Sequence, residues 1–156
     1  MKHYDVIIIG AGPTGLMAAT QLARFNINFL IVDSKAGPTE QSRAIVVTAR
    51  SMEIYQQMGI SDVAINEGRF IIDFAIFVKG KEKATAHVGE FGKGLTDFSY
   101  LLAFEQSKNE TLLVKKLAGY NQEICWNTQL ENILQQKQKI ELSLKYLTEP
   151  GQPIEK

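Results

Sequence analysis

Three glycines near the start of the chain have the spacing of a phosphate-binding turn. Gly10, Gly12 and Gly15 form a G-x-G-x-x-G pattern, and Asp33 follows eighteen positions after the last of them. The first glycine permits a tight turn, the second lets backbone approach a diphosphate, and the third lets helix and strand pack closely. The Asp33 carboxylate can accept hydrogen bonds from an adenosine ribose. The pattern predicts a dinucleotide site, the alternative being a purely structural strand-helix-strand unit.

This chemistry requires a strand before the glycines and a helix and a second strand after them. Residues 6–9 and 29–32 are unbroken apolar runs too short for helices, which predicts two buried parallel strands. Residues 16–25 are good helix formers, and Asn26 suits the left-handed residue that ends a helix. The apolar face of this helix carries Leu16, Ala19, Leu22 and Ala23. Free N–H groups at the helix start would then point at the diphosphate.

Composition narrows the class of protein. The 156 residues carry 17 basic and 17 acidic side chains without a basic cluster, which argues against nucleic acid as a partner. Cys125 is the only cysteine, so no disulfide or multi-cysteine metal site is expected, and Cys125 is expected in the core. His87 is expected to be an exposed or hydrogen-bonded structural residue. No apolar run resembles a signal peptide or is long enough to span a membrane, which predicts a soluble, cytoplasmic protein.

The rest of the chain predicts further helices and two hairpins within one mixed unit. The expected elements are an extended piece at 43–47, a helix from Thr48 to Gly59, a helix starting at Ser61, a hairpin of 70–78 with 84–88, a β-prone stretch at 98–104, a helix from Ser107 to Ala118, a strand at 123–126, and a hairpin of 130–134 with 140–147. Met52, Tyr55 and Met58 share one helix face. Ser107 and Glu110 match a capping box, which predicts the start of the later helix, and Gly119 is expected to close it.

Three segments together resemble the flavoprotein aromatic hydroxylases, the class A monooxygenases that include p-hydroxybenzoate, phenol and rifampicin hydroxylases. They are residues 5–33 with the turn G-A-G-P-T-G-L, residues 42–54 with S-R-A and T-A-R-S-M-E-I, and residues 100–113 with Y-L-L and Gln106. The resemblance implies that Arg43 lies against the FAD diphosphate or ribityl, that Gln106 bonds the ribityl chain, and that backbone near Leu130 meets the adenine. The predicted cofactor-binding residues are Gly10, Gly12, Pro13, Thr14, Gly15, Asp33, Ser34, Arg43, Gln106 and Leu130.

The resemblance also implies a fold and an activity. It predicts an α/β, Rossmann-like FAD-binding unit with added β-hairpins, similar to the p-hydroxybenzoate hydroxylase fold but truncated. Residues 1–156 would be a single N-terminal FAD-binding fragment, with residues 70–104 on the substrate-domain side. In the intact family NAD(P)H reduces FAD, and O2 supplies the oxygen that enters an aromatic or similar small molecule. The cofactor carries this chemistry, so no catalytic acid, base, nucleophile or metal is expected from this chain.

Departures from the family pattern leave other functions open. Asp33 stands where the family usually has glutamate, Asn26 replaces a usual glycine, and the later aspartate-glycine and glycine-aspartate motifs do not occur in this chain. A fragment of this kind is expected to be inactive alone. An NAD(P)-linked reductase would share the glycine turn and Asp33 without needing Arg43 or Gln106. A non-catalytic dinucleotide-binding module is a further alternative, and the oligomeric state does not follow from the sequence.

Overall fold

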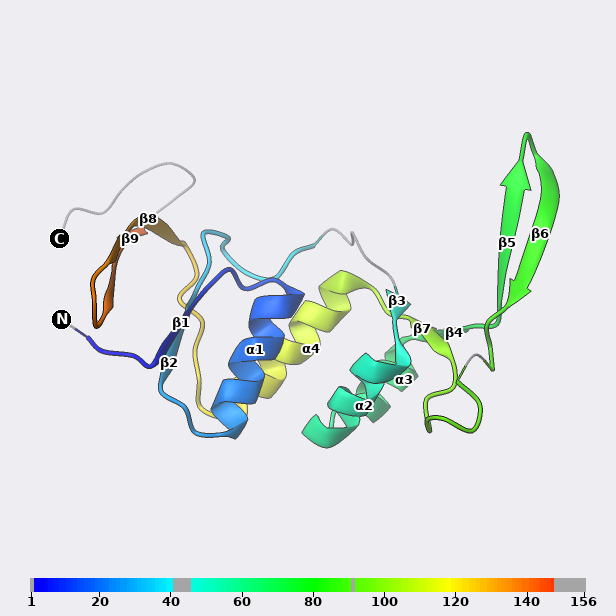
Figure 1. Cartoon of the computed structure of the whole chain (residues 1–156), viewed down its shortest axis with the longest axis horizontal. Helices are drawn as coiled ribbons and strands as arrows, with labels where there is room; N and C mark the ends of the chain where they lie inside the picture. Colours follow the sequence, from blue (N-terminus) through cyan, green and yellow to red (C-terminus); the bar gives the residue numbers. More distant parts are fainter. Residues whose placement is uncertain (1, 41–45, 91, 148–156) are drawn as a thin grey trace. The chain divides into compact units, whose positions relative to one another are not determined.

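The computed structural model describes residues 2–40, 46–90 and 92–147. Within these residues the chain forms four helices and nine strands (Figure 1). In chain order they are β1 (Val6–Ile9), α1 (Pro13–Arg24), β2 (Phe29–Val32), β3 (Val46–Val47), α2 (Ala49–Met58), α3 (Ser61–Glu67), β4 (Arg69–Ile71), β5 (Asp73–Val78), β6 (Lys81–His87), β7 (Leu101–Ala103), α4 (Gln106–Ala118), β8 (Thr128–Gln135) and β9 (Ile140–Tyr146). The chain divides into unit 1, Met1–Glu40 with Leu113–Lys156, and unit 2, Gln41–Leu112.

Unit 1 is built on the predicted strand-helix-strand arrangement. β1 and β2 pair in parallel, from Val6 opposite Phe29 to Ile9 opposite Val32, which confirms both strand bounds. β2 is mostly buried, but Val6 and Ile9 at the ends of β1 are 36% and 47% exposed. The expected complete burial of β1 is therefore wrong within the described residues, where β2 is its one paired neighbour. Parallel strands are normally covered on both faces, so an apolar run alone overstates burial.

Helix α1 packs through small side chains and ends on a left-handed residue. Leu16, Ala19 and Ala23 are buried as predicted, whereas Leu22 is half-buried. Thr20 is also buried, and its hydroxyl donates to the Leu16 carbonyl at 2.7 Å. The expected helix began at Leu16, whereas α1 starts at Pro13, a residue well suited to a first helical turn. Asn26 has φ 55°, and this confirms its predicted role in turning the chain toward β2.

The C-terminal part of unit 1 adds one bridge and one hairpin. Residues 123–126 do not form the predicted strand; a single parallel bridge joins Val32 to Cys125, which is half-buried rather than fully in the core. β8 and β9 then pair from Thr128 opposite Tyr146 to Gln135 opposite Ile140. The second predicted hairpin is thus confirmed, with its first strand starting two residues earlier. β8 begins beside Asp33, whose carbonyl accepts from the Thr128 N–H at 2.8 Å.

Unit 2 contains the predicted α2 and α3 and a three-stranded antiparallel sheet. Met52, Tyr55 and Met58 are buried on α2, and Gly59 ends that helix in the left-handed conformation with φ 68°. Thr48 is the N-cap residue of α2, although its side chain makes no capping bond. In the sheet, β7 lies between β3 and β4. These elements bury Leu102 completely, so the core of unit 2 includes this central strand.

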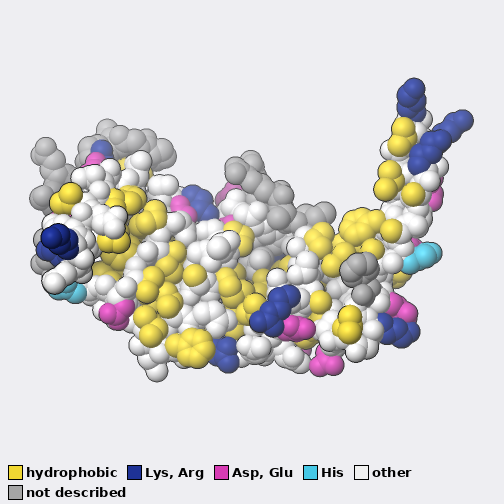
Figure 2. Space-filling view, in the orientation of Figure 1, with side chains coloured by type: hydrophobic (Ala, Val, Ile, Leu, Met, Phe, Trp, Pro, Cys, Tyr) yellow, Lys and Arg dark blue, Asp and Glu magenta, His cyan; other side chains and the backbone are white. Residues whose placement is uncertain are grey.

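The first predicted hairpin is confirmed, but its predicted first strand is divided between two sheets. The expected strand 70–78 breaks at Ile72, whose carbonyl accepts from the N–H groups of Val88 and Gly89 at 2.8 and 3.0 Å. β4 therefore pairs with β7, whereas β5 pairs with β6. Lys79 and Gly80 both have positive φ, the requirement of a two-residue hairpin turn, so β6 begins at Lys81. Hydrophobic side chains lie along this hairpin, with cationic side chains at its tip (Figure 2).

Helix α4 is confirmed, but the capping box predicted at its N-terminus is wrong. It begins at Gln106, so Ser107 lies inside the first turn and its carbonyl accepts from the Thr111 hydroxyl. Glu110 is completely buried and accepts a bond from the Gln106 side chain instead of completing a capping box. At the other end α4 stops at Ala118, directly before Gly119, as predicted, and the left-handed residue that follows is Asn121, with φ 57°. Asparagine tolerates this conformation, so a residue other than glycine can turn the chain after the helix.

Candidate functional site

The glycine turn lies between β1 and α1 in unit 1, and each glycine meets a different steric demand. Gly10 has φ +105°, a backbone conformation that side chains rarely adopt. A Cβ added to Gly15 would lie 1.9 Å from the Gly10 carbonyl oxygen, so the helix start and the turn approach as closely as predicted. A Cβ on Gly12 would meet no described atom within 4 Å. Gly12 therefore borders open space, where a diphosphate needs close access to backbone.

The start of α1 offers a positive dipole end to an anion. Gly12 is the N-cap residue, Pro13 occupies the first turn, and the first turn contains no acidic side chain. Helix geometry leaves the N–H groups of Thr14 and Gly15 without intrahelical acceptors. Unpaired N–H groups at a helix start favour bound phosphate through both hydrogen bonding and the helix dipole. The predicted residues Pro13 and Thr14 therefore lie where a diphosphate can be held.

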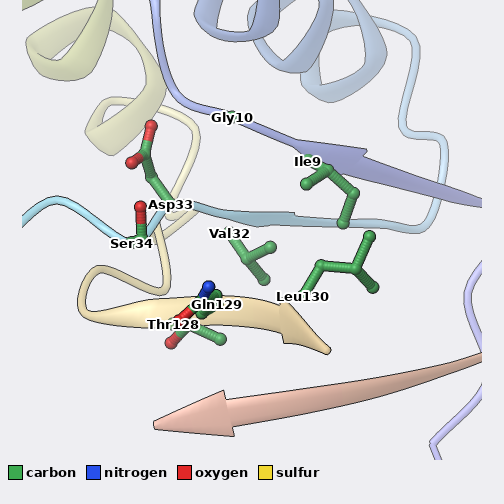
Figure 3. A pocket seen from close by; sticks show the side chains of 8 residues that line it. All are labelled: Ile9, Gly10, Val32, Asp33, Ser34, Thr128, Gln129 and Leu130. Carbon is green, nitrogen blue, oxygen red and sulfur yellow. The ribbon is translucent and has the colours of Figure 1, made fainter. Parts of the chain in front are cut away.

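A hollow of about 230 Å³ lies beside this turn, within unit 1 (Figure 3). It is lined by Ile9, Gly10, Val32, Asp33, Ser34, Thr128, Gln129 and Leu130. Figure 3 shows the apolar side chains of Ile9, Val32 and Leu130 on one side and the polar groups of Asp33 and Ser34 on the other. Pockets for whole ligands usually measure roughly 300–1,000 Å³. The hollow thus fits part of a dinucleotide, with an apolar side for a base and a polar side for a sugar.

Four of the predicted site residues line this hollow together. Gly10, Asp33 and Ser34 come from the carboxyl ends of β1 and β2, and Leu130 comes from β8. Sequence reasoning missed Thr128 and Gln129, which precede Leu130, and the apolar side chains that end β1 and β2. The signal for the latter was present, because ligands of open parallel sheets bind at the carboxyl ends of strands. Thr128 is buried and its hydroxyl donates to the Trp126 carbonyl at 3.0 Å.

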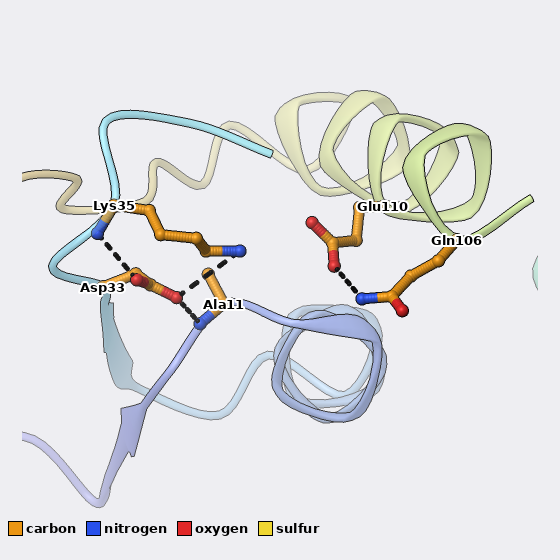
Figure 4. A network of polar contacts seen from close by, with 5 residues as sticks. All are labelled: Ala11, Asp33, Lys35, Gln106 and Glu110. Atoms are coloured by element: carbon orange, nitrogen blue, oxygen red, sulfur yellow. Dashed lines mark hydrogen bonds and ion pairs between the residues drawn. The ribbon is translucent and has the colours of Figure 1, made fainter. Parts of the chain in front are cut away.

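Asp33 is held by the backbone on both sides of its carboxylate (Figure 4). Its Oδ2 accepts from the Ala11 N–H at 2.6 Å, and its Oδ1 accepts from the Lys35 N–H at 2.8 Å. The Lys35 Nζ lies 3.9 Å from Oδ2, and the Asp33 side chain is 10% exposed. The bond to Ala11 joins the residue between the first two glycines to the acid after β2. Sequence reasoning predicted a ribose acceptor at Asp33 and did not foresee this bond.

Two predicted residues, Arg43 and Gln106, belong by sequence to unit 2. Gln106, the first residue of α4 in unit 2, donates from Nε2 to Oε1 of the buried Glu110 at 2.8 Å (Figure 4). Arg43 lies outside the described residues. The geometry of unit 1 therefore bears on eight of the ten predicted residues, whereas the roles of Gln106 and Arg43 stay predictions.

Other site types find no support in the described part of the chain. No group of three or more His, Cys, Asp or Glu side chains there could hold a metal ion. None of its helices is long and apolar enough to cross a membrane. His87 is largely exposed and hydrogen-bonded to Asp73, the environment predicted for it. The dinucleotide hollow is thus the candidate site that the geometry supports.

Comparison with known proteins agrees with this geometry. The family model described as an FAD binding domain matches residues 3–153. The chain is 32% identical over 126 residues to the 6-methylpretetramide 4-monooxygenase of Streptomyces rimosus, and 34% identical over 111 residues to the rifampicin monooxygenase of Rhodococcus hoagii. These alignments cover 81% and 71% of this chain but 22% of either relative.

Solved structures share the fold. The p-nitrophenol 4-monooxygenase of Pseudomonas putida has a TM-score of 0.82 at 24% identity, covering 90% of this chain and 36% of that protein. The anhydrotetracycline hydroxylase of Streptomyces rimosus has a TM-score of 0.76 at 25% identity, covering 92% of this chain and 28% of that protein. The Rossmann-like α/β fold with added hairpins is thereby confirmed. The chain belongs to the FAD-binding domain family and is an FAD-binding domain of the class A flavin monooxygenase type.

Proposed function

We propose that this chain binds the adenosine diphosphate half of FAD in the hollow beside its glycine turn. The observation that carries the proposal is the joint lining of that hollow by Gly10, Asp33, Ser34 and Leu130. Gly10 directly follows β1, Asp33 and Ser34 directly follow β2, and Leu130 lies in β8. The residues present also fit the cofactor sterically, because Gly12 borders open space among the described atoms.

Each part of the site has a defined task in this proposal. The N–H groups of Thr14 and Gly15 bind the diphosphate, which comes close to backbone at Gly12. Asp33 and Ser34 bind the ribose hydroxyls. The adenine packs on the apolar side chains of Ile9, Val32 and Leu130. Arg43 is assigned to the diphosphate or ribityl of FAD, as the family resemblance implies. Gln106 is assigned to the ribityl chain on the same basis.

In an intact protein we infer an NAD(P)H-dependent monooxygenase that hydroxylates an aromatic or similar small molecule with O2. When bound, FAD supplies the redox chemistry, and the residues of this chain bind and orient its adenosine end. Relatives named 6-methylpretetramide 4-monooxygenase and 3-hydroxybenzoate 4-monooxygenase support an aromatic substrate class. Residues 1–156 then act as one N-terminal FAD-binding fragment, with residues 70–104 on the substrate side. A cytoplasmic location accompanies this proposal.

Cofactor binding can be tested on the purified chain. Titration with FAD, followed by flavin fluorescence, is expected to give saturable binding, whereas NAD at equal concentration should compete poorly. A flavin is yellow and NAD is not, so the absorbance spectrum of protein recovered after gel filtration gives a second reading. A chain that retained NAD and failed to bind FAD would contradict the proposal and favour a reductase.

We further propose that the 156-residue chain does not turn over by itself. It spans 22% of the first two curated relatives, and a hydroxylation site needs flavin ring, nicotinamide and substrate in one water-excluded space. Mixing the chain with FAD, NADPH or NADH and a panel of phenols should give no hydroxylated product by mass spectrometry. Substrate-stimulated NAD(P)H consumption coupled to product would overturn this part of the proposal.

A further inference from the structure

Asp33 connects three segments of unit 1 that are distant in sequence. Its backbone N–H donates to the Cys125 carbonyl at 3.0 Å, and its backbone carbonyl accepts from the Thr128 N–H at 2.8 Å. Its carboxylate accepts from the Ala11 N–H at 2.6 Å and from the Lys35 N–H at 2.8 Å. Both backbone groups and both carboxylate oxygens of this residue are therefore bonded without any ligand.

The bond to Ala11 holds a residue that lies between the backbone hydrogen bonds of the sheet and those of the helix. The β1–β2 ladder continues one residue beyond β1, where the Gly10 N–H donates to the Val32 carbonyl at 2.8 Å. α1 then begins its own bonds with the Leu16 N–H on the Gly12 carbonyl at 2.9 Å. Ala11 lies between these two systems, after a glycine with φ +105°. The Asp33 carboxylate supplies the acceptor that neither the sheet nor the helix gives to Ala11.

We propose that Asp33 is a positioning residue that holds the glycine turn in its diphosphate-accepting form before any ligand binds. A hydrogen bond to a charged acceptor is stronger than a neutral one, and the 10% exposure of this side chain limits competition from water. A turn ordered in advance costs the ligand less conformational entropy on binding. A carboxylate has about four acceptor positions, so the ribose contact assigned to Asp33 remains compatible with this role.

The test uses amide hydrogen exchange of the ligand-free chain, measured residue by residue by NMR. Asp33→Ala should speed exchange of the Ala11 N–H by roughly 10- to 100-fold, the range for losing a hydrogen bond to a charged group. Asp33→Asn should give a smaller increase, because its one carbonyl oxygen can serve the N–H of either Ala11 or Lys35. Asp5→Ala, which removes an exposed acid just before β1, is the matched control and should leave Ala11 unchanged.

Exchange of the Ile31 N–H, in the buried strand β2, separates a local effect from general destabilisation. Selective acceleration at Ala11 in either Asp33 variant supports the proposal. Unchanged exchange at Ala11, or equal acceleration at Ala11 and Ile31, overturns it. If Asp33→Ala does not fold, Asp33→Asn alone decides between these outcomes.

A ligand measurement tests the role toward the diphosphate, which rests on the proposed function. If Asp33 acted on the ribose alone, Asp33→Asn would lower the affinities for adenosine and for ADP by the same factor. Positioning of the turn predicts a larger loss for ADP, by roughly threefold or more, because only ADP contacts the turn. Equal losses overturn this role. Absence of ADP and FAD binding in the parent chain would instead refute the proposed function and leave the exchange result unaffected.

Discussion

Substitutions at Gly12 and Gly15 test the site directly. A side chain at Gly15 would disturb protein packing, whereas one at Gly12 would enter the space assigned to the ligand. A Cβ at Gly15 would lie 1.9 Å from the Gly10 carbonyl oxygen, so Gly15→Ala must push apart turn and helix by roughly 1 Å. Overpacking of this kind costs about 1–3 kcal/mol of stability. At Gly12 the backbone has φ −83°, which any residue adopts, and a Cβ meets no described atom within 4 Å.

Gly12→Val should therefore change the free energy of unfolding by less than about 1 kcal/mol. Its branched side chain would occupy the space assigned to the diphosphate, and a clash of about 1–3 kcal/mol corresponds to roughly 5- to 150-fold weaker FAD binding. Urea unfolding gives the first quantity and fluorescence titration with FAD the second. A folded Gly12→Val protein that bound FAD as tightly as the parent would refute the assignment of this space to the diphosphate.

Three further predictions concern residues elsewhere in the chain. Burial raises the pKa of Tyr55, and its hydrogen bond to an asparagine lowers that pKa by less. The tyrosine of the unfolded chain therefore ionises first, so the free energy of unfolding should fall as the pH rises above about 10. Tyr55→Phe should reduce this alkaline loss in pH-dependent urea unfolding, while costing about 1 kcal/mol at pH 7. Leu130→Asp should weaken FAD binding in the same titration, whereas Leu134→Asp, on the same strand but outside the hollow, should not. Arg43→Ala and Gln106→Ala should each lower FAD affinity and leave NAD affinity unchanged; unaltered FAD binding in both would favour a reductase.

Local backbone chemistry was the part of the fold most open to prediction from sequence. Gly15, Asn26 and Gly59 each occupy a position that sterics or a left-handed conformation restricts to a few residue types, and each was assigned correctly. The wrong assignments involve competition between partners. Glu110 bonds a side chain one turn away instead of a capping serine, and Ile72 leaves the strand pattern because its carbonyl accepts two bonds from residues 88 and 89.

The candidate site was predictable where a motif spans few residues and less so where distant segments meet. Gly10, Asp33 and Ser34 follow from strand ends that lie close in sequence. The family resemblance predicts Leu130. It does not predict its neighbours Thr128 and Gln129, and strand periodicity does not reveal which residues face a hollow. The Asp33 bond to Ala11 depends on side-chain length and on the exact turn geometry, and no sequence pattern reports either.

The discontinuity of unit 1 has a consequence for folding kinetics. One wall of the hollow comes from residues 9–34 and the other from residues 128–130, with all of unit 2 between them in sequence. Joining these walls closes a long loop, a step that lowers folding rates because its entropy is lost before contacts form. A ligand that contacts both walls gains its full binding energy only after closure, late in folding. FAD is therefore expected to slow unfolding of the chain while leaving its folding rate nearly unchanged.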